Sequence, residues 1–242
     1  MVDKNVFKER IVALLKELST SQDENIDKAS ELFAECIKND GVVHIFGTGH
    51  SIGMGIEMSG KLGNLIPIHM MRLTDFVTKG VITLKEFTDK DNDFERRSDL
   101  AQRFYELYDI RPQDVFMIIS NSGINGLVID LAIEAKRHGH KVVIVTSMKH
   151  TNAEASRHPS GKKLYMFGDV VIDNCGPHGD ALLETGGIAN VCSVSSICNN
   201  FISQSLTVKT VHRLATDGDD VPLITGDTVN DQKRFEHYRS RI

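Results

Sequence analysis

The most restrictive feature of this sequence is a pattern that occurs twice, in which a short apolar run ends at a turn rich in Gly and Ser and a helical pattern follows. The first copy spans residues 41–62 and contains the turn Gly47-Thr-Gly-His-Ser51. The second spans residues 114–138 and contains the turn Ser120-Asn-Ser-Gly-Ile-Asn125. A strand that breaks into a glycine-rich turn and then a helix is typical of the start of an α/β unit.

The remainder of the chain continues this alternation. Further apolar runs predict strands at 65–71, 141–146 and 169–173, and helical spacing predicts helices within 4–38 and 188–211. Strands that alternate with helices predict a mostly parallel, doubly wound sheet covered on both faces. We therefore expect one domain over residues 1–242. Its parts are N-terminal helices in 1–40, a core at about 41–211 and a polar C-terminal tail at 212–242 that ends in a short surface helix. Within the core we expect a helical insertion at about 75–112, whose charged stretch 85–99 is a solvated face.

Composition excludes several classes of protein. The chain has 28 Lys and Arg against 33 Asp and Glu, a formal charge of −5, so a surface for nucleic acid is not expected. No segment reaches the roughly 18 consecutive apolar residues that a membrane span requires. The first residues form an amphipathic helical pattern interrupted by charges, unlike a signal peptide. Four cysteines without C-x-x-C spacing favour free thiols, and we expect a cytoplasmic protein.

The two turns are the strongest candidates for a ligand site. In a flavodoxin-like strand order, the loops after the first and third strands flank the crevice where ligands bind. Each turn precedes a helix, whose first N–H groups are unpaired and whose dipole favours an anion. Taken singly, Ser before a helix and Gly in a turn are ordinary capping and turn residues. Together, and without Lys or Arg, the turns favour a phosphate monoester held by hydrogen bonds, at a site made of Gly49, Ser51, Ser120, Asn121, Ser122, Gly123 and Asn125.

The chain resembles the SIS (sugar isomerase) domain family from about Val42 to Val211. The resemblance rests on the two turns and on residues 141–147, and it points to a bacterial branch of expected phosphosugar isomerases through 157–162 and 173–180. It implies a five-stranded parallel sheet, a homodimer or larger assembly, and a sugar-phosphate ligand. Phosphate contacts in the family fall on positions that match Ser51, Ser120, Ser122 and Asn125, where Asn125 replaces a Ser or Thr.

Isomerisation of an aldose to a ketose needs a base that moves a proton between adjacent carbons. We predict Glu57 as this base, because it lies on the helix that leaves the first turn, and His50 as an acid or ring-opening group. Heptose-phosphate isomerases of the family bind zinc from the same helix through a His and a Glu. Glu57 and Lys61 match those positions here, so no metal and no cofactor are predicted.

The sequence leaves three functions open. A phosphosugar isomerase is the predicted function, a lyase or etherase of an amino-sugar phosphate is the second, and a non-catalytic phosphosugar sensor is the third. Three roles stay open for His178, Asp180 and Glu184, which lie in the segment 173–180 or just after it. These roles are metal coordination, contacts with sugar hydroxyls, and the stabilisation of structural turns. Self-association is expected, because the helices at both ends carry more apolar surface than one thin sheet can cover. Nucleic acid and membranes are not expected as partners.

Overall fold

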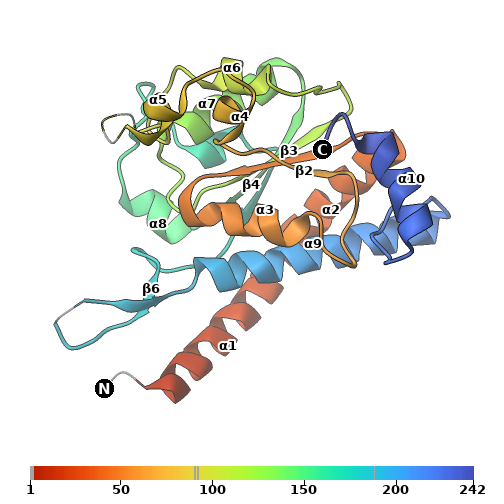
Figure 1. Cartoon of the computed structure of the whole chain (residues 1–242). Coiled ribbons are helices and arrows are strands. Elements are labelled where there is room, and N and C mark those ends of the chain that lie inside the picture. Colours follow the sequence, from red (N-terminus) through yellow and green to blue (C-terminus); the bar gives the residue numbers. More distant parts are fainter. Residues whose placement is uncertain (1–2, 90, 92, 188) are drawn as a thin grey trace.

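A five-stranded parallel sheet forms the centre of the protein (Figure 1). The computed structural model describes residues 3–89, 91, 93–187 and 189–242. The strand order is β2-β1-β3-β4-β5, which confirms the flavodoxin-like arrangement. Every strand pair is parallel, and β1 and β3 lie side by side from Val43 opposite Val115 to Gly47 opposite Ile119. The strands are β1 (Val43–Gly47), β2 (Ile68–Met70), β3 (Val115–Ile119), β4 (Lys141–Thr146) and β5 (Val170–Asp173).

One face of the sheet is covered by four helices. They are α1 (Lys4–Ser21), α2 (Asp23–Lys38), α3 (Ile52–Met58) and α9 (Ser195–Asp217). α2 and α3 pack directly on strand residues that point to this face, and α1 and α9 pack against α2 on the outside. Leu18, Phe33 and Ile202 are buried against strand residues such as Met117. The helices predicted near both ends of the chain are therefore present.

The other face is covered by α4 (Asp75–Thr78), α5 (Leu84–Thr88), α6 (Ala101–Tyr105) and α7 (Gly126–Arg137). The described residues of the insertion at 75–112 form three short helices, α4, α5 and α6. Phe76, Phe94 and Phe104 from this segment are buried with Phe46 and Phe116 of the sheet. The segment therefore completes a second core, because aromatic side chains spaced through the charged sequence all turn inward. Two smaller helical elements follow β4, namely α8 (Met148–Ala153) and the 3-10 turn η2 (Leu164–Phe167).

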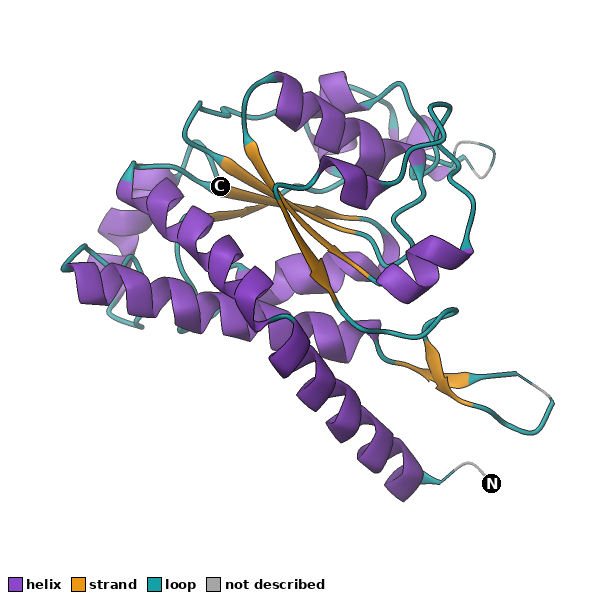
Figure 2. Ribbon diagram, turned by 180° about the vertical axis from the view of Figure 1, so that it is seen from behind, coloured by secondary structure: helices purple, strands orange, loops and turns teal. Residues whose placement is uncertain are grey.

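A small antiparallel hairpin extends from the body beside the first half of α1 (Figure 2). It consists of β6 (Ala181–Leu183) and β7 (Val191–Ser193), and the sequence did not predict it. The guanidinium of Arg10 in α1 donates to the carbonyl oxygen of Leu182 at 3.1 Å. At the other end of the molecule, α10 (Thr228–Tyr238) is the short helix predicted in the tail. In the described part of the chain, no helix combines the length and apolar character needed to cross a bilayer.

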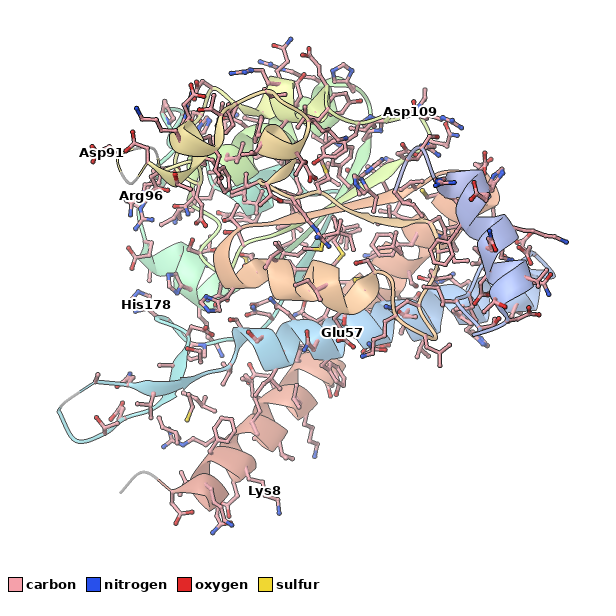
Figure 3. The ribbon with its side chains drawn as sticks, in the orientation of Figure 1. Lys8, Glu57, Asp91, Arg96, Asp109 and His178 are labelled. Atoms are coloured by element: carbon pink, nitrogen blue, oxygen red, sulfur yellow. The ribbon has the colours of Figure 1, made fainter. Side chains whose placement is uncertain are left out.

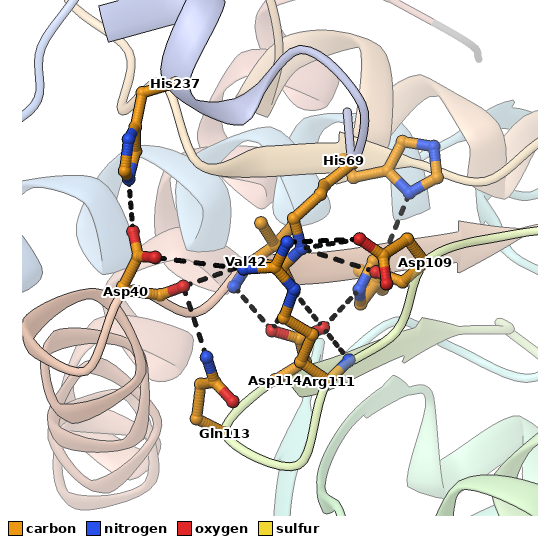
Figure 4. A network of polar contacts seen from close by, with 10 residues as sticks. Asp40, Val42, His69, Asp109, Arg111, Gln113, Asp114 and His237 are labelled. Carbon is orange, nitrogen blue, oxygen red and sulfur yellow. Dashed lines mark hydrogen bonds and ion pairs between the residues drawn. The ribbon is translucent and has the colours of Figure 1, made fainter.

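A buried polar network holds the chain's last residues to the N-terminal ends of β1 and β3 (Figure 4). The carboxylate of Asp114 accepts from Arg241 at 2.6 and 2.5 Å and lies 3.0 Å from Nε2 of His44. Nδ1 of His44 lies 2.9 Å from Nδ1 of His69. With both rings neutral, Nε2 of His44 donates to the carboxylate and its Nδ1 accepts from Nδ1 of His69. Burial lowers the pKa of His44, and it lowers that of His69 to about 3. Both histidines are buried core residues.

Candidate functional site

The two predicted turns meet in one cavity at the C-terminal edge of the sheet. The cavity has a volume of about 250 Å³. The first turn contributes Thr48, Gly49, His50 and Ser51, and the second contributes Ser120, Asn121, Ser122 and Asn125. The structure thus brings together the predicted phosphate-binding residues and His50. They meet because β1 and β3 are adjacent parallel strands, so the loops that leave them open at the same edge.

Glycines shape both turns. Gly49 and Gly123 have φ values of +53° and +62°, a left-handed region that other residues seldom adopt. A Cβ on Gly123 would lie 3.0 Å from the hydroxyl oxygen of Thr151, so the turn is also tightly packed. The amide of Gly123 donates to Oγ of Ser120 at 3.1 Å, which leaves the Ser120 hydroxyl proton available to a ligand. Gly123 therefore contributes by its backbone conformation.

The helix after the second turn points its N-terminus at the cavity. α7 begins at Gly126, and its N-cap residue Asn125 makes no side-chain capping hydrogen bond. The amide of Leu127 in the first turn of α7 already donates to the carbonyl oxygen of Glu95 at 3.2 Å, and the helix dipole favours an anion at this place. Oδ1 of Asn125 accepts from the guanidinium of Arg157 at 2.9 Å. This contact orients the Asn125 amide so that its NH₂ group is free to donate to a ligand.

Arg157 was not predicted as a site residue, and in the sequence it belongs only to the segment 157–162 that carries the family resemblance. Neither turn contains Lys or Arg, so a cradle without cations was expected. The exposed Arg157 reaches Asn125 because its backbone N–H donates to the carbonyl oxygen of Ile124 at 2.9 Å. This contact links a loop after α8 to the second turn, and no local pattern in the sequence indicates it.

Glu57 lies outside the cavity. Its Oε1 accepts from Nζ of Lys61 at 2.6 Å and from Nε2 of Gln204 at 2.7 Å. Figure 3 shows Glu57 where α3 passes in front of α9. In this chain the carboxylate faces a lysine and α9, and its catalytic role stays a prediction. The ammonium of Lys61 therefore occupies the neighbourhood of the Glu57 carboxylate.

Two carboxylates do line the cavity, and sequence reasoning did not single them out as bases. Glu95 comes from the insertion, and a Cβ placed on Gly49 would lie 3.5 Å from its Oε1. The stretch 85–99 was expected to be a solvated face, and for Glu95 this expectation is wrong because the buried Phe94 anchors the chain here. Asp180 is the second carboxylate, and it accepts from the N–H and the hydroxyl of Ser195, both at 2.8 Å. Asp180 thus fixes the start of α9, where Ser195 lines the cavity.

A larger cavity of about 510 Å³ lies along the free edge of β2. It is lined by apolar side chains, by Lys79 and Arg72, and by Tyr108, whose hydroxyl donates to Asp75 at 2.7 Å. It contains none of the Gly- and Ser-rich turns. It runs along the outer strand and not between the loops after β1 and β3, where ligands of such sheets bind, so the smaller cavity is the candidate site.

Comparison with known proteins agrees with this architecture. A family model for the SIS domain matches residues 6–147, and the chain therefore belongs to the SIS domain family. Among curated proteins, it is similar to UPF0309 proteins of bacteria. The protein from Halalkalibacterium halodurans is 35% identical over 221 residues, which cover 90% of this chain and 88% of the relative. The protein from Geobacillus kaustophilus is 32% identical over 244 residues, with coverage of 98% and 95%.

Solved structures share the fold at lower identity. The phosphoheptose isomerase GmhA of Neisseria gonorrhoeae superposes with a TM-score of 0.56 at 18% identity and covers 85% of this chain and 96% of its own. A phosphoheptose isomerase of Francisella tularensis gives 0.57 at 18% identity, with coverage of 87% and 98%. The NanR protein of Vibrio vulnificus, solved with ManNAc-6P, gives 0.54 at 14% identity, with coverage of 94% and 67%. At these identities the likeness shows a common fold.

Proposed function

We propose that this protein binds a phosphorylated sugar or amino sugar in the cavity between its two turns and acts as an aldose–ketose isomerase. The observation that supports this most directly is the convergence of Ser51, Ser120 and Ser122 beside the N-terminus of α7. Hydroxyl and amide donors suit the phosphate oxygens. The neighbours named as phosphoheptose isomerases, and the one solved with ManNAc-6P, are consistent with this ligand class.

The remaining lining residues suggest how the sugar is processed. A phosphate held by the serines leaves the sugar within the cavity that Glu95 and His50 also line. Isomerisation then requires a base that removes the proton from the carbon next to the carbonyl and returns it to the neighbouring carbon. Glu95 is the carboxylate of the cavity best placed to do this. Glu57, the base predicted from the sequence, would need a rearrangement or a neighbouring subunit to reach the same sugar.

Ligand binding is tested by thermal unfolding with a panel of sugar phosphates, each compared with its unphosphorylated sugar. A ligand at about 100 times its Kd adds about 2.7 kcal/mol to stability. We expect Ser120→Ala and Ser122→Ala to remove the shift. The matched control is Ser205→Ala, because this hydroxyl donates to the Phe201 carbonyl oxygen within α9 at 2.8 Å. A shift that survives both turn variants would contradict the phosphate site.

Catalysis is tested with the sugar phosphate that binds. Glu95→Gln and Glu57→Gln each keep the size of the side chain and remove the basic carboxylate. Loss of a general base lowers turnover by roughly 10²–10⁴-fold. We expect this loss in Glu95→Gln, with ligand binding largely preserved. A loss confined to Glu57→Gln would restore the base predicted from the sequence. Tight binding without turnover would favour the sensor, and release of a substituent would favour the lyase or etherase.

Self-association is also part of the proposal. Ile56 on α3 and Val208 on α9 are 57% and 66% exposed, and Glu57 lies on the same helix as Ile56. A second copy that covers these side chains would place the cavity near a subunit interface. We expect at least a dimer in sedimentation at micromolar concentration, and a monomer alone would contradict it. The four cysteines are free thiols, which agrees with the cytoplasmic location expected from the sequence.

A further inference from the structure

Three side chains that could ligate a metal gather at the mouth of the sugar cavity. They are His150 in α8, Glu154 directly after α8, and His178 in the loop after β5. One potential ligand atom of each residue lies within 4.8 Å of those of the other two. Nε2 of His178 is 2.8 Å from Oε1 of Glu154, and the two imidazole rings have centroids 5.1 Å apart. Figure 3 labels His178 beside α8, on the side from which the hairpin leaves the body.

The ligand set has a definite chemistry. Two imidazoles and one carboxylate form the three-ligand set of catalytic zinc sites, in which water or substrate takes the fourth position. We propose that His150, Glu154 and His178 bind a divalent transition metal of the zinc class. The sequence predicted no metal at Glu57 and Lys61 and left the role of His178 open, and only the fold brings His150 and Glu154 to His178. These residues are also separate from Glu57 on α3 and from Lys61, which follows that helix.

Small movements complete the site. Tetrahedral zinc with bonds of about 2.0–2.1 Å holds its ligand atoms about 3.3 Å apart. The most distant pair in the cluster therefore has to approach by at most about 1.5 Å. The side chains of His178 and Glu154 are 57% and 41% exposed, so rotation meets little packing resistance. His150 is half-buried and supplies the fixed ligand of the three.

Metal binding has a structural cost that can be named. Nδ1 of His150 accepts from the amide of Gly179 at 3.1 Å. A neutral imidazole has one lone pair, so a metal on either nitrogen removes this hydrogen bond. The loop that carries Gly179 also carries Asp180, and His150 itself lines the sugar cavity. A bound metal therefore rearranges one wall of the cavity, and it does so whether or not the ligand is a sugar phosphate.

The test measures zinc binding by calorimetry with the full chain stripped of metal and without any sugar. We expect one equivalent of zinc to bind to the unmodified protein. His178→Ala and Glu154→Gln should each weaken binding by about 100-fold or more, since even changes to residues that only support metal ligands cost 10–100-fold. The matched control is His237→Ala, because His237 is exposed and paired with one carboxylate, Asp40 at 2.5 Å. Zinc binding in this control should be unchanged.

A second measurement identifies the ligand atoms. Cobalt in place of zinc should give visible bands typical of nitrogen and oxygen ligands, without the near-ultraviolet band of a thiolate. This excludes Cys192, the one exposed cysteine of the described residues. No zinc binding, a thiolate band, or equal weakening by all three variants would overturn the proposal. Because no sugar is present, the outcome does not depend on whether the protein is an isomerase.

Discussion

Replacing Arg241 by Met should destabilise this protein more than any other change to a single charged residue near its C-terminus. The guanidinium is 2% exposed, and the carboxylate of Asp114 that it binds is fully buried. Its other nitrogens donate to the carbonyl oxygens of Asp40 and Asp109 at 3.1 and 3.3 Å. Met fills much of the same space but donates nothing. The variant therefore leaves a buried carboxylate without its cation.

The expected loss is about 3–5 kcal/mol, the usual cost of removing one partner of a buried ion pair. Three donors to Asp114 remain, namely His44 and the amides of Val42 and Arg111, so the lower end of the range is expected. Burial alone would raise the pKa of Asp114, but hydrogen bonds from His44 and Arg241 outweigh it and lower the pKa to about 2, so the carboxylate is ionised in the native protein. In the variant its pKa should rise.

The assay is urea unfolding followed by circular dichroism, with free energies of unfolding extrapolated to water. Arg239→Met is the matched control, because Arg239 is 76% exposed and pairs with Glu236 on the surface. Exposed pairs contribute about 0–1 kcal/mol, so this variant should unfold almost as the unmodified protein does. A loss below about 1 kcal/mol for Arg241→Met would refute the reasoning. It would mean that the three remaining donors satisfy the buried carboxylate without Arg241.

Three further predictions concern other parts of the molecule. Burial lowers the pKa of His44 and His69, so below pH 6.5 the unfolded chain binds more protons than the folded protein. The free energy of unfolding should therefore fall as the pH is lowered, by up to about 5 kcal/mol between pH 6.5 and 3 for His69 alone. The variant His69→Gln still donates to His44 and does not titrate, and an equally steep pH profile in this variant would count against the assignment. In thermal unfolding, Gly123→Ala should destabilise the protein by about 1–3 kcal/mol more than Gly139→Ala. Both glycines have a positive φ, but of the two only Gly123 has neighbours within 4 Å of an added Cβ. Equal losses of stability would contradict the packing argument. Arg157→Ala should weaken phosphosugar binding by about tenfold, or about 1.4 kcal/mol, and should hardly change the free energy of unfolding. Unchanged affinity would show that Arg157 does not support the site.

The central sheet could be predicted from the sequence because its signals are local. Continuous apolar runs such as 115–119 are typical of strands buried on both faces, and the Gly- and Ser-rich turns mark where they end. The hairpin at 181–193 escaped prediction for the opposite reason. Its strands are three residues long and β7 is fully exposed, so no apolar run or alternation marks them.

The candidate site was predictable only in part. The two turns carry their chemistry within a few residues, and parallel strands place such turns at one edge. Glu95, Arg157 and the pair His150–His178 reach the same region through tertiary contacts between distant segments. Glu57 illustrates the limit of counting along a helix. Its distance from Ser51 suits a base, but its direction is set by Lys61 and Gln204, and the latter lies on a helix far along the chain.

The pairing of β1 with β3 also has a consequence for folding kinetics. The two strands are neighbours in the sheet, yet the whole segment of α3, β2 and the insertion separates them in the chain. Closing so long a loop costs conformational entropy, and proteins rich in contacts between distant residues fold slowly. The two halves of the cavity meet only when this loop has closed. We therefore expect an added phosphosugar to leave the refolding rate unchanged and to slow unfolding, because a ligand that needs both turns binds after the rate-limiting step.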